Sequence, residues 1–330
     1  MKKDIKVGVL MGGLSQEAAI SLQSGEAVVE ALRARGYQAE PIIVDERIDQ
    51  VLRESSVDVI FNALHGRFGE DGCIQGLLEM MRIPYTGSGV LASALSMDKI
   101  KAKEIFRLHN LPTPPYYTFN SDELRSIAEV HGSFGYPVVV KPASEGSSIG
   151  VSLVESAEEL EAACDQALEL DRQVLVERHI AGQEVHVGII NGQVLGAIGI
   201  VPHNALFDYQ AKYTPGYAHY HLPAKLSAER YRGVLTQALR AYHALGCRGA
   251  ARVDMIVSEL GNEYILEINT APGLTKRSLL PRLAEYAKLG FEEMVERVLS
   301  TATLDLPRKQ PAIVQGTTPD TPSKRRAAEG

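Results

Sequence analysis

Two pairs of polar residues lie within strand-like apolar runs in the last third of the chain. Arg252 and Asp254 are two positions apart in ARVDMIV, and Glu267 and Asn269 are two apart in YILEIN. Because side chains alternate along a strand, both members of each pair point to the same face. On neighbouring strands, Asp254, Glu267 and Asn269 would bring together three oxygen donors, as Mg²⁺ requires when substrate phosphates complete its octahedron. A polar pair on a solvent-exposed face would explain either strand alone, but two such pairs beside a Gly-Pro turn favour a metal site.

A lysine that precedes a glycine- and serine-rich turn could bind phosphate groups. Lys141 ends the apolar run PVVVKP, and ASEGSSIG follows it. The lysine charge, the backbone N–H groups and the serine hydroxyls could together hold a polyphosphate. Alone, this segment is more typical of a solvated hairpin. The polar pairs at 252/254 and 267/269 are what favour a phosphate-binding turn instead. The GxxxxGK[ST] motif is absent from the sequence, and GxGxxA at 87–92 is better interpreted as the turn that starts a helix.

The first hundred residues alternate strand and helix patterns. The near-continuous apolar runs Ile5–Met11 and Val57–Leu64 are typical of parallel strands buried on both faces. A helix and the strand Gln38–Val44 lie between them, and a second helix follows Gly72. This order predicts an open α/β layer with a parallel sheet. A third helix is expected around Ser96–Leu108, and the proline-rich LPTPPYY after it indicates a boundary.

From about residue 136 the pattern favours an α+β unit with an antiparallel sheet. Ser156 and Glu159 are expected to form a capping box at the start of a helix. An amphipathic helix is expected around 231–242, and the non-periodic stretch 203–221 before it has the length of a lid or binding loop. The expected strands are PVVVKP, VSLV, Gln173–Glu177, Glu184–Ile190, Val194–Val201, Ala250–Val257 and Glu263–Ile268.

Length and composition limit the class of protein. A chain of 330 residues favours two domains, or three small ones, and a net charge of −7 argues against a broad nucleic-acid-binding surface. Three cysteines without a CxxC pair fit a reducing compartment. The apolar run Val7–Met11 is too short for a signal peptide or a membrane span, so we expect a cytoplasmic protein without a membrane partner. The polar segment 306–330 is expected to be a disordered tail.

Other histidines and cysteines have simpler interpretations. His219 and His221 have no third ligand nearby in the sequence and are interpreted as ordinary loop or strand residues. His131 is expected at the surface. Cys73 and Cys164 fall on apolar helical faces and are expected to be core thiols.

Six motifs, in this order, resemble those of the D-alanine–D-alanine ligase family of the ATP-grasp superfamily. They are GGLSQE at 12–17, ALHGRFGEDG at 63–72, YTGSG at 85–89, SMDK at 96–99, the Lys141 turn, and EINTAPG at 267–273. The match runs from about Val7 to Leu299. It implies a three-domain ATP-grasp architecture of α/β and α+β type, with an N-terminal open parallel-sheet domain at 1–97, a central domain at 98–188 and a C-terminal domain at 189–305.

The resemblance also implies an activity and its partners. Such an enzyme joins two D-alanine molecules through an acyl phosphate, for peptidoglycan precursor synthesis. Its cofactors would be ATP and two Mg²⁺ ions, with Mn²⁺ as a substitute, and its partner a second copy of the chain in a homodimer. Two alternatives stay open: a related ligase with a D-hydroxy acid or another amino acid as second substrate, and a nucleotide-binding protein without ligase activity.

Individual residues receive roles through the same resemblance. Catalytic roles fall to Glu17, Ser147, Tyr213, Arg252 and Gly273. Substrate binding falls to His65, Ser278 and Leu279. The nucleotide would be held by Lys99, Lys141, Ser148, Glu177, Arg178, His179, Ile180, Glu184 and Lys212. The metal ligands would be Asp254, Glu267 and Asn269.

Two positions distinguish this chain within the resemblance. Glu17 would bind the ammonium group of the first D-alanine together with Ser147 and Tyr213, but Ala18 replaces the arginine that usually follows it. Relatives that make D-alanyl-D-lactate have a cationic histidine where this chain has Tyr213, and that cation would repel an ammonium group. We therefore expect a peptide product and very poor use of D-lactate.

Overall fold

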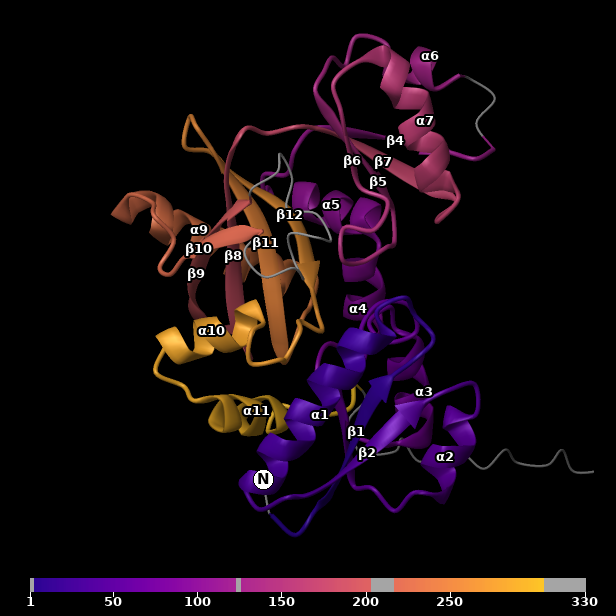
Figure 1. Ribbon diagram of the computed structural model, residues 1–330, viewed down its shortest axis with the longest axis vertical. Coiled ribbons are helices and arrows are strands. Elements are labelled where there is room, and N and C mark those ends of the chain that lie inside the picture. Colours follow the sequence, from indigo (N-terminus) through magenta and orange to yellow (C-terminus); the bar gives the residue numbers. More distant parts are fainter. Residues whose placement is uncertain (1–2, 123–125, 203–216, 306–330) are drawn as a thin grey trace, which may run out of the picture.

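The chain forms three sheets with their associated helices, and the computed structural model describes residues 3–122, 126–202 and 217–305. In Figure 1, the N-terminal unit and the unit that contains α6 and α7 lie at opposite ends, and the largest sheet lies to one side at mid-height. The predicted combination of a parallel α/β unit with antiparallel α+β units is confirmed.

The N-terminal unit is a parallel sheet in the order β2-β1-β3. Its elements are β1 (Lys6–Gly12), α1 (Ala18–Ala34), β2 (Gln38–Val44), α2 (Ile48–Glu54), β3 (Val59–Asn62) and α3 (Cys73–Met81). Val9 belongs to the core cluster that includes α1, whereas its neighbour Leu10 belongs to the cluster that includes α3. Both faces of β1 are therefore buried, which explains its unbroken apolar sequence.

The helix predicted around Ser96–Leu108 follows directly on another helix, which begins after the turn at 87–89. Helix α4 (Val90–Met97) ends before Asp98, and α5 (Lys99–Leu108) begins directly after it. Asp98 has an extended backbone, and its carboxylate accepts a hydrogen bond from the Lys101 N–H at 3.0 Å. The predicted helix is therefore confirmed, and Asp98 caps its start.

The central unit has an antiparallel sheet in the order β4-β7-β5-β6. Its elements are β4 (Tyr116–Asn120), α6 (Ile127–His131), β5 (Val138–Pro142), β6 (Ser152–Val154), α7 (Ala157–Leu168) and β7 (Gln173–Arg178). The predicted capping box is wrong. Ser156 precedes α7 without a side-chain cap, and the Glu159 carboxylate instead accepts a hydrogen bond from the Glu155 N–H at 2.9 Å.

Two side chains lie elsewhere than the sequence predicts. His131 is buried, stacks on Tyr136 with 4.4 Å between ring centroids, and hydrogen-bonds Tyr117 at 2.9 Å through Nδ1. Cys73 is exposed because it occupies the first position of α3, whereas Cys164 is buried as expected. The prediction for His131 fails because the short helix α6 packs against an aromatic cluster that the chain pattern does not reveal.

The largest sheet is antiparallel in the order β10-β9-β8-β11-β12. The C-terminal elements are β8 (Gly182–Ile190), β9 (Gln193–Pro202), β10 (Ala218–His221), α9 (Ala228–Ala244), β11 (Ala250–Ser258), β12 (Glu263–Asn269), α10 (Leu279–Tyr286) and α11 (Phe291–Leu299). Asp254 lies opposite Glu267, and Arg252 lies opposite Asn269. The two polar pairs therefore share one face of neighbouring strands, as predicted. None of the helices in the described ranges is long and apolar enough to cross a membrane.

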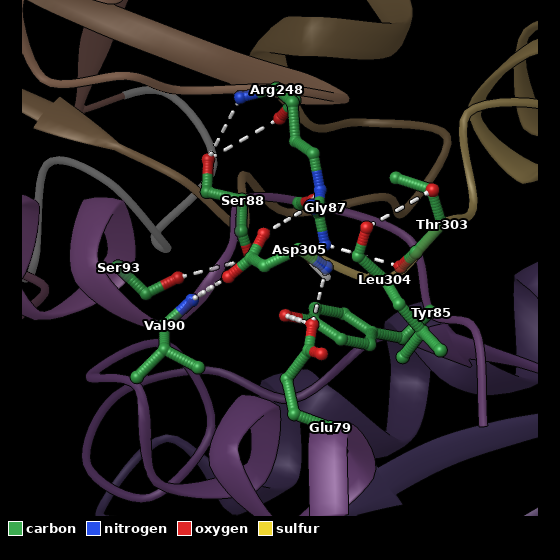
Figure 2. A network of polar contacts seen from close by, with 10 residues as sticks. All are labelled: Glu79, Tyr85, Gly87, Ser88, Val90, Ser93, Arg248, Thr303, Leu304 and Asp305. Carbon is green, nitrogen blue, oxygen red and sulfur yellow. Dashed lines mark hydrogen bonds and ion pairs between the residues drawn. The ribbon is translucent and has the colours of Figure 1, made fainter. Parts of the chain in front are cut away.

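The end of the described chain packs back on the N-terminal unit (Figure 2). Thr303 pairs with Tyr85 in an antiparallel bridge. The Asp305 carboxylate accepts a hydrogen bond from the first N–H of α4 at 3.1 Å and pairs with Arg248, whose Nε donates to the Gly87 carbonyl at 3.0 Å. Helices α1 and α11 also pack on each other. These contacts fix the N-terminal unit against the largest sheet.

Candidate active site

A cavity of about 420 Å³ lies between the central sheet and the largest sheet. Strands β5 and β7 contribute one wall, and β8, β11 and β12 contribute the other. Aliphatic walls combined with a cluster of charged groups suit a nucleotide. The predicted nucleotide and metal residues that line it are Lys99, Lys141, Ser148, Glu177, Arg178, His179, Ile180, Glu184, Asp254 and Glu267.

A buried carboxylate between two lysines lies in this cavity. The Glu177 carboxylate contacts the ammonium groups of Lys103 and, at 2.5 Å, Lys141. Burial raises the pKa of Glu177, but the two lysines outweigh burial and leave it below its usual value. Burial lowers the pKa of Lys141, but the neighbouring carboxylates, Glu177 foremost, outweigh burial and leave it above its usual value. Both groups therefore stay ionised, and Lys141 presents a fixed positive charge.

Lys103 is the member of this cluster that sequence reasoning missed. Its side chain is fully buried on α5, and its ammonium group donates to Thr113 Oγ1 at 2.6 Å. Burial lowers its pKa more than Glu177 raises it. The signal was present in the sequence, because Lys103 lies three residues from both Ile100 and Phe106 on the apolar face of its helix.

Lys99 joins the nucleotide cavity to the Ser144–Gly150 turn. Its ammonium group donates to the Glu145 carbonyl at 2.5 Å and lies 3.5 Å from Glu267 Oε2. Lys99 and Lys141 thus bring two positive charges to the cavity from different elements, as the binding of a polyphosphate requires.

A smaller pocket of about 110 Å³ shares Glu267 with the nucleotide cavity. The predicted residues that line it are Glu17, His65, Ser147, Arg252, Glu267, Asn269, Gly273, Ser278 and Leu279. They come from the N-terminal unit, the Ser144–Gly150 turn and the C-terminal sheet. The structure therefore brings the predicted substrate residues together beside the predicted phosphate site.

Glu17 and the Ser144–Gly150 turn meet in this pocket. The Ser147 hydroxyl donates a hydrogen bond to Glu17 Oε1, and Ser147 has a φ of 50°. A Cβ atom on Gly146 would lie 2.6 Å from Glu17 Oε2, and one on Gly66 would lie 2.7 Å from it. Only glycines allow both backbones to approach the carboxylate so closely.

Two buried titratable groups, His65 and Glu70, lie behind Glu17. The pKa of His65 is lowered to about 4, mainly by burial and also by the positive charge of Arg252. A backbone hydrogen bond with Ala271 acts in the opposite direction and raises it. Burial and the charge of the neighbouring Glu17 raise the pKa of Glu70 to about 8. A hydrogen bond from the Gly66 N–H at 2.8 Å acts in the opposite direction. Glu70 was not singled out from the sequence, although it lies within the motif that contains His65.

The predicted metal donors lie on the shared face of β11 and β12. Asp254 accepts two hydrogen bonds from Arg252, at 2.7 and 2.8 Å, and its Oδ1 lies 3.1 Å from His186 Nδ1. Like charges directly opposite each other are unfavourable, so the facing Asp254 and Glu267 carboxylates fit a cation between them. Among the described residues, no three His, Cys, Asp or Glu side chains gather as a metal-binding group. The donor set fits Mg²⁺, which usually takes one or two carboxylates and completes its shell with substrate oxygens.

An anion could bind where α10 begins. Ser278 precedes this helix, and its hydroxyl lies 2.8 Å from Thr275 Oγ1. The backbone N–H groups at a helix N-terminus attract a carboxylate. The pocket also includes Arg277, which sequence reasoning missed. Two further predicted residues, Lys212 and Tyr213, lie outside the described residues, as does the tail 306–330.

Two antiparallel sheets that enclose a nucleotide-sized cavity between a lysine-bearing turn and an acidic strand pair define the ATP-grasp class. Comparison with known proteins narrows this class. The family model for the C-terminus of D-ala D-ala ligase matches residues 105–300, and that for the N-terminus matches 46–88. The chain belongs to the D-alanine–D-alanine ligase family.

Curated relatives and solved structures agree with this assignment. The chain is 55% identical to a D-alanine–D-alanine ligase of Geotalea uraniireducens over 92% of its own length and 97% of the relative. It is 52% identical to a ligase of the same name from Geobacter sulfurreducens, over 92% and 96% of the two chains.

Among solved structures, the D-alanine–D-alanine ligase of Bacillus anthracis complexed with ATP has a TM-score of 0.80 and 34% identity, covering 90% of this chain and 97% of that one. VanG D-Ala:D-Ser ligase from Enterococcus faecalis has a TM-score of 0.80 and 31% identity, covering 90% and 99%.

Proposed function

We propose that this chain joins two D-alanine molecules into D-alanyl-D-alanine and converts ATP to ADP and phosphate. The observation that carries the proposal is the shared wall of the two cavities. Because Glu267 lines both, the phosphate end of a nucleotide and a small substrate beside Glu17 can meet. The product would serve peptidoglycan precursor synthesis.

Amide formation from a carboxylate requires activation. Transfer of the γ-phosphoryl group to the carboxylate of the first D-alanine gives an acyl phosphate and ADP. The free amine of the second D-alanine attacks the carbonyl carbon, loses a proton, and displaces phosphate. Lys99 and Lys141 would neutralise the phosphate oxygens, and Arg252 with the Gly273 N–H would stabilise the oxyanion.

The substrates would bind on opposite sides of the reacting carbonyl. Glu17, buried and bonded to Ser147, would hold the ammonium group of the first D-alanine. Ser278 and the Leu279 N–H would hold the carboxylate of the second. Lys212 and Tyr213 keep their proposed roles at the γ-phosphate and beside Ser147.

Asp254, Glu267 and Asn269 would hold Mg²⁺, two ions by resemblance to the family, with Mn²⁺ as a substitute. A bound ion supplies positive charge that offsets the negative charge developing on the transferred phosphoryl group. A homodimer and a cytoplasmic location are also proposed on the basis of the family alone.

A second candidate function has a different second substrate. Similarity to the D-Ala:D-Ser ligase, at 31% identity, supports it, whereas relatives at 50–55% identity carry the D-alanine–D-alanine name. A substrate panel of D-alanine, D-serine and D-lactate, with products quantified by mass spectrometry, separates the two. Dominant D-alanyl-D-serine or depsipeptide at neutral pH would overturn the first proposal.

Site variants test the same proposal. Lys141→Ala and Asp254→Asn should each lower the turnover rate by about 10²–10³. Lys141 offsets phosphoryl charge directly, and Asp254 would hold the Mg²⁺ that does the same. Glu17→Gln should raise the KM for the first D-alanine far more than the KM for ATP. Lys101→Ala, which removes an exposed pair with Glu104, is the matched control. Turnover at the wild-type rate in the Lys141 or Asp254 variant would refute the assigned roles.

A further inference from the structure

Arg67 lies in the N-terminal unit, two residues after His65, and reaches the central unit. Its Nε donates to Glu145 Oε1 at 3.0 Å, and its Nη2 lies 3.7 Å from Asp171 Oδ2. The Arg67 side chain is 44% exposed, whereas the Glu145 and Asp171 side chains are only 14% and 13% exposed. One guanidinium group thus bridges two largely buried carboxylates on another unit.

Both carboxylates lie at the base of the Ser144–Gly150 turn. Glu145 is part of the turn, and the Asp171 carboxylate accepts a hydrogen bond from the Ser144 N–H at 2.7 Å. A few residues further on, Ser147 bonds Glu17. The turn is therefore attached to the N-terminal unit at two places, by Arg67 at its base and by Glu17 at its tip.

Glu145 would place a negative charge beside a bound nucleotide. Glu145 lines the nucleotide cavity together with Lys99 and Lys141. A carboxylate in the wall of a site for a triphosphate repels that ligand unless a cation neutralises it. The ammonium group of Lys99 contacts the backbone carbonyl of Glu145, whereas Arg67 pairs with its carboxylate and supplies the neutralising charge there.

We propose that Arg67 is a positioning residue that seats the Ser144–Gly150 turn over the reaction site and cancels the charge of Glu145 beside the nucleotide. This role rests on the proposed ligase function. A seated turn keeps water from the acyl phosphate. If water attacks instead of the second D-alanine, the acyl–phosphate bond is hydrolysed, D-alanine is regenerated and phosphate is released without dipeptide.

The test compares Arg67→Gln, Glu145→Gln, the double variant, and the control Arg47→Gln, which removes an exposed pair with Asp45 far from the turn. Phosphate release and dipeptide are measured in the same reaction, and the KM for ATP and for D-alanine are determined separately. Arg67→Gln should raise the KM for ATP about three- to tenfold, the range expected for a partly exposed pair with two partners. It should also raise the phosphate-to-dipeptide ratio, which a loss of folded protein alone leaves unchanged.

The double variant isolates the role of charge. Because Glu145→Gln removes the uncompensated carboxylate, the KM for ATP of the double variant should return toward the wild-type value. Values for Arg67→Gln equal to those of the Arg47→Gln control would overturn the proposal, and so would a double variant no better than Arg67→Gln. If the wild-type protein itself forms no dipeptide, the proposed function fails instead.

Discussion

Replacing Glu177 by glutamine tests whether the buried cluster of two lysines and one carboxylate organises the nucleotide cavity. The Lys103 and Glu177 side chains are 0% and 2% exposed, so no solvent can replace their contact. Glu177→Gln keeps the shape of the side chain but leaves two ammonium groups without their anion.

Removing one partner of a buried ion pair typically costs about 3–5 kcal/mol, because the other charge stays buried and uncompensated. An exposed pair costs at most about 1 kcal/mol. Glu104→Gln provides the exposed reference, since Glu104 pairs with Lys101 at 2.9 Å with both side chains half exposed. At roughly 2–4 °C per kcal/mol, Glu177→Gln should lower Tm by about 6–20 °C, and Glu104→Gln by no more than about 4 °C.

Circular dichroism is the suitable assay, because the chain contains no tryptophan. Lys103→Met combined with Glu177→Gln removes one of the two uncompensated charges, so the double variant should recover part of the lost Tm. Equal Tm values for the Glu177 and Glu104 variants would refute the argument, as would a double variant less stable than Glu177→Gln.

Three further predictions concern other parts of the structure. Burial holds the pKa of His65 at about 4 instead of 6.5, so the contribution of neutral His65 to the free energy of unfolding is fully present above pH 6.5. This contribution is lost as the pH falls toward 4, by up to about 3 kcal/mol at 1.36 kcal/mol per pH unit. Denaturant titrations of the wild type and of His65→Gln should show this pH dependence only in the wild type. Asp305→Ala should lower the free energy of unfolding by about 2 kcal/mol, because it removes a helix-end acceptor and the pair with Arg248, and an unchanged urea midpoint would contradict this. Gly146→Ala should raise the KM for D-alanine more than the KM for ATP, since a Cβ would lie 2.6 Å from Glu17 Oε2. Steady-state kinetics with each substrate varied in turn measure both constants, and an equal rise in the two would contradict this prediction.

Local pattern was sufficient for the elements with strong periodicity. The apolar run of β1 and the Gln38–Val44 strand follow from alternation and length, and the two i, i+2 pairs on β11 and β12 predicted a shared polar face. A local signal misled at Ser156, where the capping motif is present without its hydrogen bond.

The sequence by itself determined the class of each unit, the family resemblance and the side chains suited to phosphate and magnesium. Only the tertiary structure decided which of them meet, because Glu17, Ser147 and Arg252 come from three units and their approach depends on how those units pack. It also revealed the buried role of Lys103 and the bridge from Arg67 to Glu145, since neither burial nor contact over 78 residues is encoded in local spacing. A pattern in the chain reports the face on which a side chain lies, whereas the free energy of burying a charge depends on the partner that the fold brings to it.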